Sequence, residues 1–281
     1  MDLGSGSLTY KNAQGGDLGT GTVGAPDTAG VYNFTTFNLS AGVTLAFNPD
    51  SLNHPVQFLD SGDVTIAGTI YINGQNSQGK KGGAGGPGGF NGGDGGGDTT
   101  STVLQGAPGA GPAGGNGRAT GNFAGGSLLL ANQQLIPLIG GSGGGGGSGN
   151  VANPGDGGSG GGGALLLASN GTITLNGTIY AAGGESIGNG RSYYDGGTGS
   201  GGSGGAVRLV VSTVKGSGTV NVTGGTNQNI TYSGGAGFVR IEAFNNTGIS
   251  IVGASSFLRP TTPSPAIPPN LPSIKITSIG G

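Results

Sequence analysis

The chain has 281 residues and a formal net charge of −2, and 72 of its residues are glycine. Charged residues make up only 8% of the chain, which argues against a basic surface for nucleic acid. The lack of cysteine excludes disulfides and thiolate metal sites, and no apolar run is long enough to predict a membrane span.

The first part of the chain contains short strand-forming segments. Residues 1–30 are rich in glycine, aspartate and threonine and are expected to form an extended lead-in. Residues 31–47 predict two short strands separated by Gly42. Residues 55–74 predict another pair of strands, joined by a turn in which Asp60 and Asp63 are interpreted as turn formers.

A sequence repeat organises the middle of the chain. Residues 64–74, 173–183 and 214–224 share a Gly-Thr-aliphatic centre and a closing glycine. Each unit reads as strand, turn, strand, turn and a variable insertion, which is typical of one coil of a parallel β-solenoid. One coil is too small to bury its own apolar face, so stacking must supply the core. The residues expected to point inward are Ile66, Ile70, Leu175, Ile179, Val220 and Val222.

The fold class predicted for residues 31–258 is therefore all-β, a right-handed parallel β-helix or solenoid. Its glycine-rich insertions are expected at residues 75–126, 140–163, 184–205 and 225–236. The alternation within the strands also fits an antiparallel β-sandwich, which is the alternative fold. Between the first two insertions, Pro137 predicts that residues 135–139 form an edge strand or a bend.

The glycine runs need their own physical explanation. Ordering a glycine costs roughly 1–2 kcal/mol of backbone freedom, and no side chain offsets this cost. Backbone hydrogen bonds and close backbone packing can offset it. Residues 82–89 carry Gly, Ala and Pro where a left-handed extended helix suits them. We therefore predict that some runs pack side by side as extended polyglycine helices, the alternative being loose surface loops.

The C-terminal residues 259–281 differ in composition from the rest of the chain. They contain a proline-rich stretch, which predicts an extended, semi-rigid linker. Residues 273–279 then alternate as a strand does, with apolar positions at Ile274, Ile276 and Ile279. This terminal strand either docks on its own solenoid or adds to a sheet edge of another subunit, so these three residues are possible subunit contacts.

Two nucleotide- or hydrolase-like motifs occur in the glycine runs. Residues 74–81 nearly match a phosphate-binding loop, but Lys81 stands where Ser or Thr would hold magnesium, and no helix is predicted to follow. Gly-x-Ser-x-Gly occurs around Ser142, Ser159 and Ser203, as chance produces in such runs. A serine triad would need His54, the one histidine, which is interpreted as a solvated turn residue.

The acidic residues predict no catalytic pair. Carboxylates for glycoside cleavage would have to face each other across a groove, and Asp60, Asp63, Glu185, Asp195 and Glu242 are spread along the chain. Asp94, Asp98 and Asp156 lie in glycine runs and leave a weak possibility of calcium binding through loop oxygens. We therefore expect no catalytic, cofactor-binding or metal residues and no enzyme activity.

One aromatic pair interrupts the third glycine-rich insertion. Tyr193 and Tyr194 lie between Arg191 and Asp195. Tyrosine supplies broad contact area at a low entropic cost, so the pair is a possible ligand or partner contact. The alternative is that these rings pin the insertion onto the solenoid.

Two families share these features. Residues 32–74, the string at residues 204–209 (Gly-Gly-Ala-Val-Arg-Leu) and Gly-Thr-Val-x-Val-x-Gly resemble glycine-rich extracellular β-helix proteins of bacteria, which are surface or secreted proteins. A strand, Asn-Gly-Thr-Ile-Tyr and a long glycine run are similar to the receptor-binding tip adhesins of T-even-type phage tail fibres. In those adhesins, polyglycine helices form a packed sandwich and the loops between them bind the host.

These observations and resemblances lead to three functional hypotheses. The first is a non-enzymatic extracellular or cell-surface structural protein, a homo-oligomer or polymer that forms a fibre or surface layer by β-stacking or C-terminal strand addition. The second is an adhesin of a cell surface or phage tip, which binds a surface glycan or protein through glycine-rich loops. The third is a β-helix enzyme that acts on polysaccharide.

Overall fold

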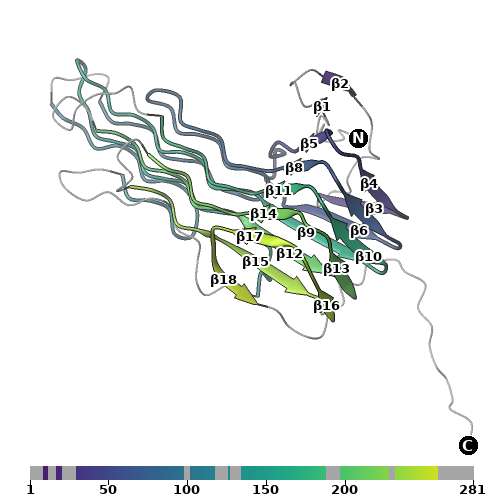
Figure 1. Cartoon of the computed structure of the whole chain (residues 1–281). Coiled ribbons are helices and arrows are strands. Elements are labelled where there is room, and N and C mark those ends of the chain that lie inside the picture. The colour runs from purple at the N-terminus through teal and green to yellow at the C-terminus, as the bar shows by residue number, and fades with distance from the viewer. Residues whose placement is uncertain are drawn as a thin grey trace, which may run out of the picture.

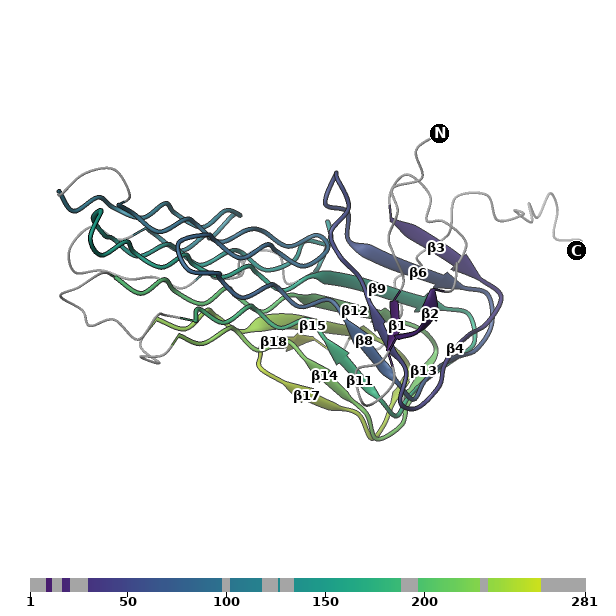
Figure 2. The same cartoon turned by 90° about the horizontal axis from the view of Figure 1, so that it is seen from above.

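The computed structural model describes residues 9–11, 17–20, 30–97, 102–117, 126, 134–187, 197–227 and 232–258. The described chain is all-β and contains two parts. One is a stack of three β-sheets, and the other is a bundle of glycine-rich segments that projects away from the sheets (Figure 1). Seen from above, the bundle extends to one side of the stack (Figure 2).

Each sheet contains one strand from each successive coil. Sheet B consists of β3 (Val31–Phe34), β6 (Val56–Asp60), β9 (Ala164–Ser169), β12 (Ala206–Val210), β15 (Gly237–Glu242) and β18 (Ala254–Leu258). Sheet C consists of β4 (Phe37–Leu39), β7 (Val64–Ile66), β10 (Thr172–Leu175), β13 (Thr213–Lys215) and β16 (Asn245–Asn246). Sheet A contains β5 (Thr44–Ala46), β8 (Thr69–Tyr71), β11 (Thr178–Tyr180), β14 (Thr219–Asn221) and β17 (Ser250–Val252).

Neighbouring strands from successive coils are parallel and in register. Ile70 pairs with Ile179, and Ile179 with Val220, so equivalent positions of the repeat lie directly above one another. This arrangement is consistent with a parallel β-solenoid, and the alternative of an antiparallel β-sandwich is wrong. Antiparallel pairing among the described strands is confined to β1 (Thr9–Lys11) and β2 (Asp17–Thr20), which extend sheet A beyond β5. The expected lead-in therefore contains a strand pair.

Each coil has three strands, whereas the sequence predicted two. The predicted second strand divides at the glycine of the repeat, so that residues 64–72 form both β7 and β8. The chain turns a corner there, and successive coils approach closely. A methyl group on Gly177 would lie 1.8 Å from the carbonyl oxygen of Gly68. The Gly-Thr centre of the repeat therefore marks a corner that has no room for a side chain.

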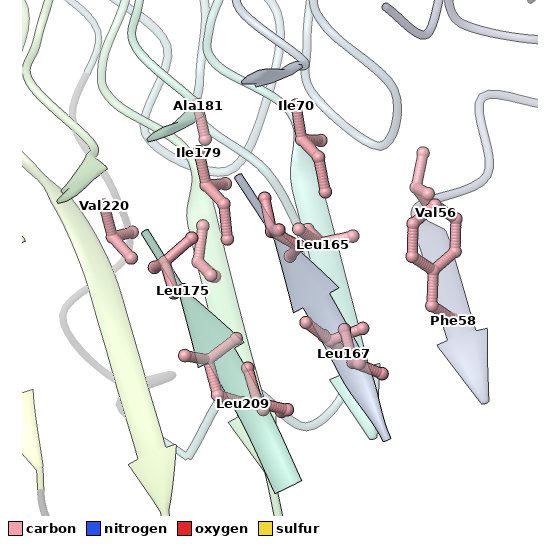
Figure 3. Packing of buried hydrophobic residues seen from close by; sticks show 14 of the residues in the cluster. Val56, Phe58, Ile70, Leu165, Leu167, Leu175, Ile179, Ala181, Leu209 and Val220 are labelled. Carbon is pink, nitrogen blue, oxygen red and sulfur yellow. The ribbon is translucent and has the colours of Figure 1, made fainter. Parts of the chain in front are cut away.

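The hydrophobic core lies between the three sheets. All six residues predicted to point inward, Ile66, Ile70, Leu175, Ile179, Val220 and Val222, are fully buried. Figure 3 shows how such side chains from successive coils gather between the strands. Aromatic rings fill the first two coils, where Phe58 contacts Tyr32, Phe34, Phe37 and Phe47 at centroid distances of 5.0–5.7 Å.

Backbone hydrogen bonds hold the glycine-rich segments together. Residues 155–163 show the pattern best, because their amides donate in a three-residue cycle to three neighbouring segments. The amides of Gly155, Gly158 and Gly161 donate to the segment 89–97. The next residue of each triplet donates to the segment 197–205, and the third residue donates to the segment 72–79. Including acceptors, this central segment bonds to six segments: 72–79, 80–88, 89–97, 140–149, 181–187 and 197–205. The predicted side-by-side packing of glycine runs is confirmed here.

A further segment covers the outer face of sheet B. Leu135 is buried against Ala164, Ala206 and Phe238, and Leu138 packs at the same surface. Residues 135–139 form a bend rather than a strand, one of the two outcomes that Pro137 predicted. Part of sheet B is therefore covered by apolar side chains on both faces, and β9 is accordingly buried along its whole length from Ala164 to Ser169.

Candidate functional site

The serines of the Gly-x-Ser-x-Gly motifs lie inside the glycine bundle. Ser142, Ser159 and Ser203 are at most 1% exposed. Their hydroxyl oxygens accept hydrogen bonds from backbone amides, as Ser203 Oγ does from the Ser142 amide at 2.8 Å and Ser159 Oγ from the Ser77 amide at 3.3 Å. Buried hydroxyls with such partners serve bundle packing.

His54 lies in the loop between the first two coils, at the base of the bundle. Its Nδ1 is 2.7 Å from Asp50 Oδ2. Burial alone would raise the pKa of Asp50, but hydrogen bonds from His54 and Leu52 and the charge of His54 together lower it. The neighbouring Asn53 joins this loop to the bundle, because its Nδ2 donates to the Gly89 carbonyl and its Oδ1 accepts from the Gly88 amide. His54 is thus part of a loop that is hydrogen-bonded to the bundle.

The amides of the phosphate-loop-like segment are already engaged. The amides of Gly74, Gln75 and Ser77 donate to the carbonyls of Ala182, Ala84 and Glu185. An extended glycine segment, rather than a helix, follows β8. A phosphate cradle needs free amides at a helix start, so the geometry of this segment does not fit one.

The acidic residues are found in separate environments. Asp60 was interpreted as a turn former, but it is the last residue of β6 and is 5% exposed. Within the described residues, neither carboxyl oxygen of Asp60 has a hydrogen-bond partner, and burial raises its pKa to about 7. Asp63 instead accepts a hydrogen bond from the Thr172 amide at 2.8 Å, as a turn residue does.

No acidic cluster suited to a metal ion is found in the part of the chain that the structure describes. Asp94 accepts a hydrogen bond from the Gly82 amide at 2.7 Å, and Asp156 is buried in the bundle. Asp98 and Asp195 lie outside the described residues. The structure therefore does not bring Asp94 and Asp156 together as calcium ligands.

A buried ion cluster that was not predicted from the sequence lies on the outer face of sheet B. Glu242 is fully buried and accepts hydrogen bonds from Arg208 Nε at 2.8 Å and from Arg240 Nε at 2.6 Å. Gln134 contacts Arg240 from the covering segment. The signal in the sequence was the recurrence of Arg at one repeat position, since Arg208 and Arg240 are paired in register.

The far end of the bundle presents exposed apolar side chains. Backbone hydrogen bonds at every third residue lead outward from Phe90 and Gly141 near the sheets to residues 102–104 and residues 150–154, each of which contains a bend. We call these the distal turns. Leu104 and Gly149 exchange two backbone hydrogen bonds, at 2.7 and 2.9 Å, which join the turns.

Each of the distal turns exposes a valine side chain. Val103 is 59% exposed and Val151 is 55% exposed. Asn150 Oδ1 accepts hydrogen bonds from the amides of Ala152 and Asn153, so the second turn is locally braced. The distal turns are therefore the best candidate for a functional site. Tyr193, Tyr194, Ile274, Ile276 and Ile279 lie outside the described residues.

Comparisons with known proteins leave the function to be argued from the structure alone. No protein-family model, curated protein or solved structure matches this chain. In the described residues, no helix has the length and apolar character needed to cross a membrane.

Proposed function

We propose that this protein is a non-enzymatic extracellular or cell-surface adhesin, in which the glycine bundle holds the distal turns against a surface glycan or protein. We infer that its coils are right-handed, as connections between parallel strands of one sheet almost always are. We also infer that the bundle segments are polyglycine II helices, because their hydrogen bonds repeat every three residues.

The observation that carries this proposal is the contrast along the bundle. Its length is made of buried backbone that is cross-linked to as many as six neighbours, while its end exposes Val103, Leu104 and Val151. A cross-linked support reduces the entropy lost when its end binds a partner. Exposed apolar side chains in a group are typical of interaction sites. Tyr193 and Tyr194, which lie outside the described residues, are proposed as additional contacts on the strength of the sequence alone.

Binding of labelled protein to a glycan array and to a panel of intact bacterial and animal cells tests this function. We expect at least one surface to bind the protein, and the double variant Val103→Asp, Val151→Asp to lose that binding. Leu52→Asp is the matched control, because Leu52 is 73% exposed in the loop at the base of the bundle. Failure of every surface to bind, or wild-type binding by the double variant to every surface that binds the protein, would refute the adhesin.

Self-assembly is a second candidate function, and the ends of the stack favour it. Among the described strands, none pairs with the outer edges of β3 and β4 at one end or of β16, β17 and β18 at the other. Parallel edges in register offer a template for another copy. The β1–β2 pair covers β5, so growth through sheet A would require this pair to move.

Electron microscopy of the purified protein tests this second candidate. Fibres or layers would support it, and uniformly single particles at high protein concentration would contradict it. Deletion of residues 273–281 examines the proposed role of Ile274, Ile276 and Ile279. Fibres that persist after this deletion would exclude strand addition and leave end-to-end stacking of the sheets.

A further inference from the structure

We propose that the outer face of sheet A binds a neutral polysaccharide, with Tyr71 and Tyr180 as the stacking platform and a column of hydroxyl side chains beside them. This surface lies on the sheet stack and is separate from the distal turns. The inference therefore stands whether or not the distal turns bind a partner.

The hydroxyl column comes from the first position of five successive strands. The register places these side chains directly above one another: Thr44, Thr69, Thr178, Thr219 and Ser250. Strands in a sheet are about 4.8 Å apart, so the hydroxyls repeat at that interval along the stack. Within the described residues, none of the five side-chain hydroxyls forms a hydrogen bond with the protein. The column therefore retains its donors and acceptors for a ligand.

The tyrosine platform occupies the neighbouring column, two positions further along the same strands. Tyr71 and Tyr180 are paired in register, with ring centroids 6.1 Å apart and an interplanar angle of 50°. Tyr71 is 44% exposed and Tyr180 is partly exposed. In the described part of the chain, neither tyrosine hydroxyl has a hydrogen-bond partner. The two rings thus offer an apolar surface with a polar rim.

The composition of the face determines the class of ligand. The two columns on β5, β8, β11, β14 and β17 contain no charged residue. A sugar ring has apolar C–H faces that suit aromatic stacking and hydroxyl groups that suit threonine. A row that repeats along the stack fits a chain of such rings better than a single one. An anionic polymer would gain no ion pair from these columns, so the ligand should be neutral.

The other outer faces lack this combination. Residues 135–138 cover part of sheet B, where Leu135 and Leu138 pack on it. Sheet C carries Lys215 in β13 and has Asp63 directly before β7. Figure 2 shows the sheet A strands β11, β14 and β17 along the side of the stack away from β3, β6 and β9. The five strands β5, β8, β11, β14 and β17 of sheet A therefore provide an uncharged and accessible face.

Affinity electrophoresis tests the proposal with native gels that contain dextran, mannan or hydroxyethyl cellulose as neutral probes and heparin as an anionic probe. We expect at least one neutral polymer to retard the full chain. The variant Tyr71→Thr, Tyr180→Thr should bind roughly tenfold more weakly, because it loses two stacking rings. Threonine preserves the strand propensity, so the variant should remain folded by circular dichroism.

A second aromatic residue supplies the matched control. Phe244 is 63% exposed and lies outside sheet A, so Phe244→Thr should bind the same polymer as wild type does. The variant Tyr71→Phe, Tyr180→Phe separates stacking from hydroxyl contacts and should keep most of the affinity. No retardation by any neutral polymer, wild-type binding by the double threonine variant, or stronger retardation by heparin would each overturn the proposal.

Discussion

Glu242 and Arg208 form a buried ion pair between adjacent coils, with 2.8 Å between Glu242 Oε1 and Arg208 Nε. Arg240 Nε contacts the same carboxyl oxygen at 2.6 Å, so one carboxylate bridges two guanidinium groups. Breaking a buried pair leaves uncompensated charge. We expect Glu242→Gln to lower the free energy of unfolding by about 3–5 kcal/mol. Urea titration followed by circular dichroism measures this, and Glu185→Gln, an exposed site, is the control.

Because the pKa of the buried Asp60 is raised, we expect the stability of the protein to fall as the pH rises. Its pKa is about 7 in the folded chain and about 3.9 when unfolded. The folded state therefore binds more protons between these values, and stability is lost from about pH 4 to about pH 7. The full loss is about 4 kcal/mol. Denaturant titrations at several pH values should show this slope, and Asp60→Asn should abolish it.

Asp50 should have the opposite effect on the pH dependence of stability, and the same denaturant titrations measure it. Its pKa is lowered in the folded chain, so its contribution is present above the unfolded pKa and is lost as the pH falls through the folded pKa. Asp50→Asn should therefore lower stability at neutral pH and remove part of the slope on the acid side, so that the variant and wild type converge at low pH. A slope between pH 4 and pH 7 that persisted in Asp60→Asn would show that another group causes it.

Gly160 lies at the centre of the bundle and should not accept a side chain. A methyl group there would be 1.9 Å from the carbonyl oxygen of Ala84. The backbones would have to separate and give up hydrogen bonds, so Gly160→Ala should cost about 3 kcal/mol or more. A methyl group on Gly79 would have no heavy atom within 4 Å apart from its chain neighbours, although the φ of Gly79 is +54°. Gly79→Ala should cost roughly 1–2 kcal/mol of backbone strain, and equal losses for both variants would contradict the close-packed bundle.

Phe58 holds the aromatic cluster in the first two coils together. It is 1% exposed and contacts four other rings. Phe58→Ala should destabilise the fold by about 3–5 kcal/mol through lost burial and the cavity left behind. Phe244→Ala removes the same side chain from an exposed position and should change stability by less than about 0.5 kcal/mol. Thermal unfolding of both variants against wild type provides the measurement.

Replacing Ser203 should lower the stability of the bundle by a smaller amount. Its hydroxyl oxygen accepts a hydrogen bond from the Ser142 amide in a fully buried site. Ser203→Ala leaves that amide without its partner and should cost about 1–3 kcal/mol. Amide hydrogen exchange should speed up at Ser142 and at its neighbours in residues 140–149. Unchanged exchange in this segment would show that the hydroxyl has no structural role.

The core of the sheet stack was predictable from the sequence because its residues repeat. Ile70, Ile179 and Val220 occupy one position of the repeat and are stacked in one column of the core. The third strand of each coil was missed, because the Gly-Thr corner divides a run that alternates without a break. Asp60 was misassigned because Asp beside Ser and Gly is typical of a turn, while its side chain continues an inward column of β6.

The arrangement within the bundle could not be predicted in detail. Glycine carries no side chain that could identify its neighbours, so nothing in residues 155–163 indicates which six segments surround them. The ion-pair partner of Arg208 could not be predicted either, because no repeated sequence pattern marks it. Glu242 comes from the next coil and has no acidic counterpart at its own repeat position, where β12 has Val210.

The three-residue cycle of hydrogen bonds in the bundle limits how the chain can change in length. The two arms at residues 140–149 and 155–163 meet at steps of three, since the amides of Gly141, Gly144 and Gly147 donate to the carbonyls of Gly162, Ser159 and Asp156. Three residues added to an arm would keep every later amide pointing toward the same neighbouring segment. One added residue would instead rotate every later amide toward a different segment. Duplication or deletion of whole triplets is therefore the change that this architecture tolerates, and it would alter the reach of the distal turns while leaving the sheets untouched.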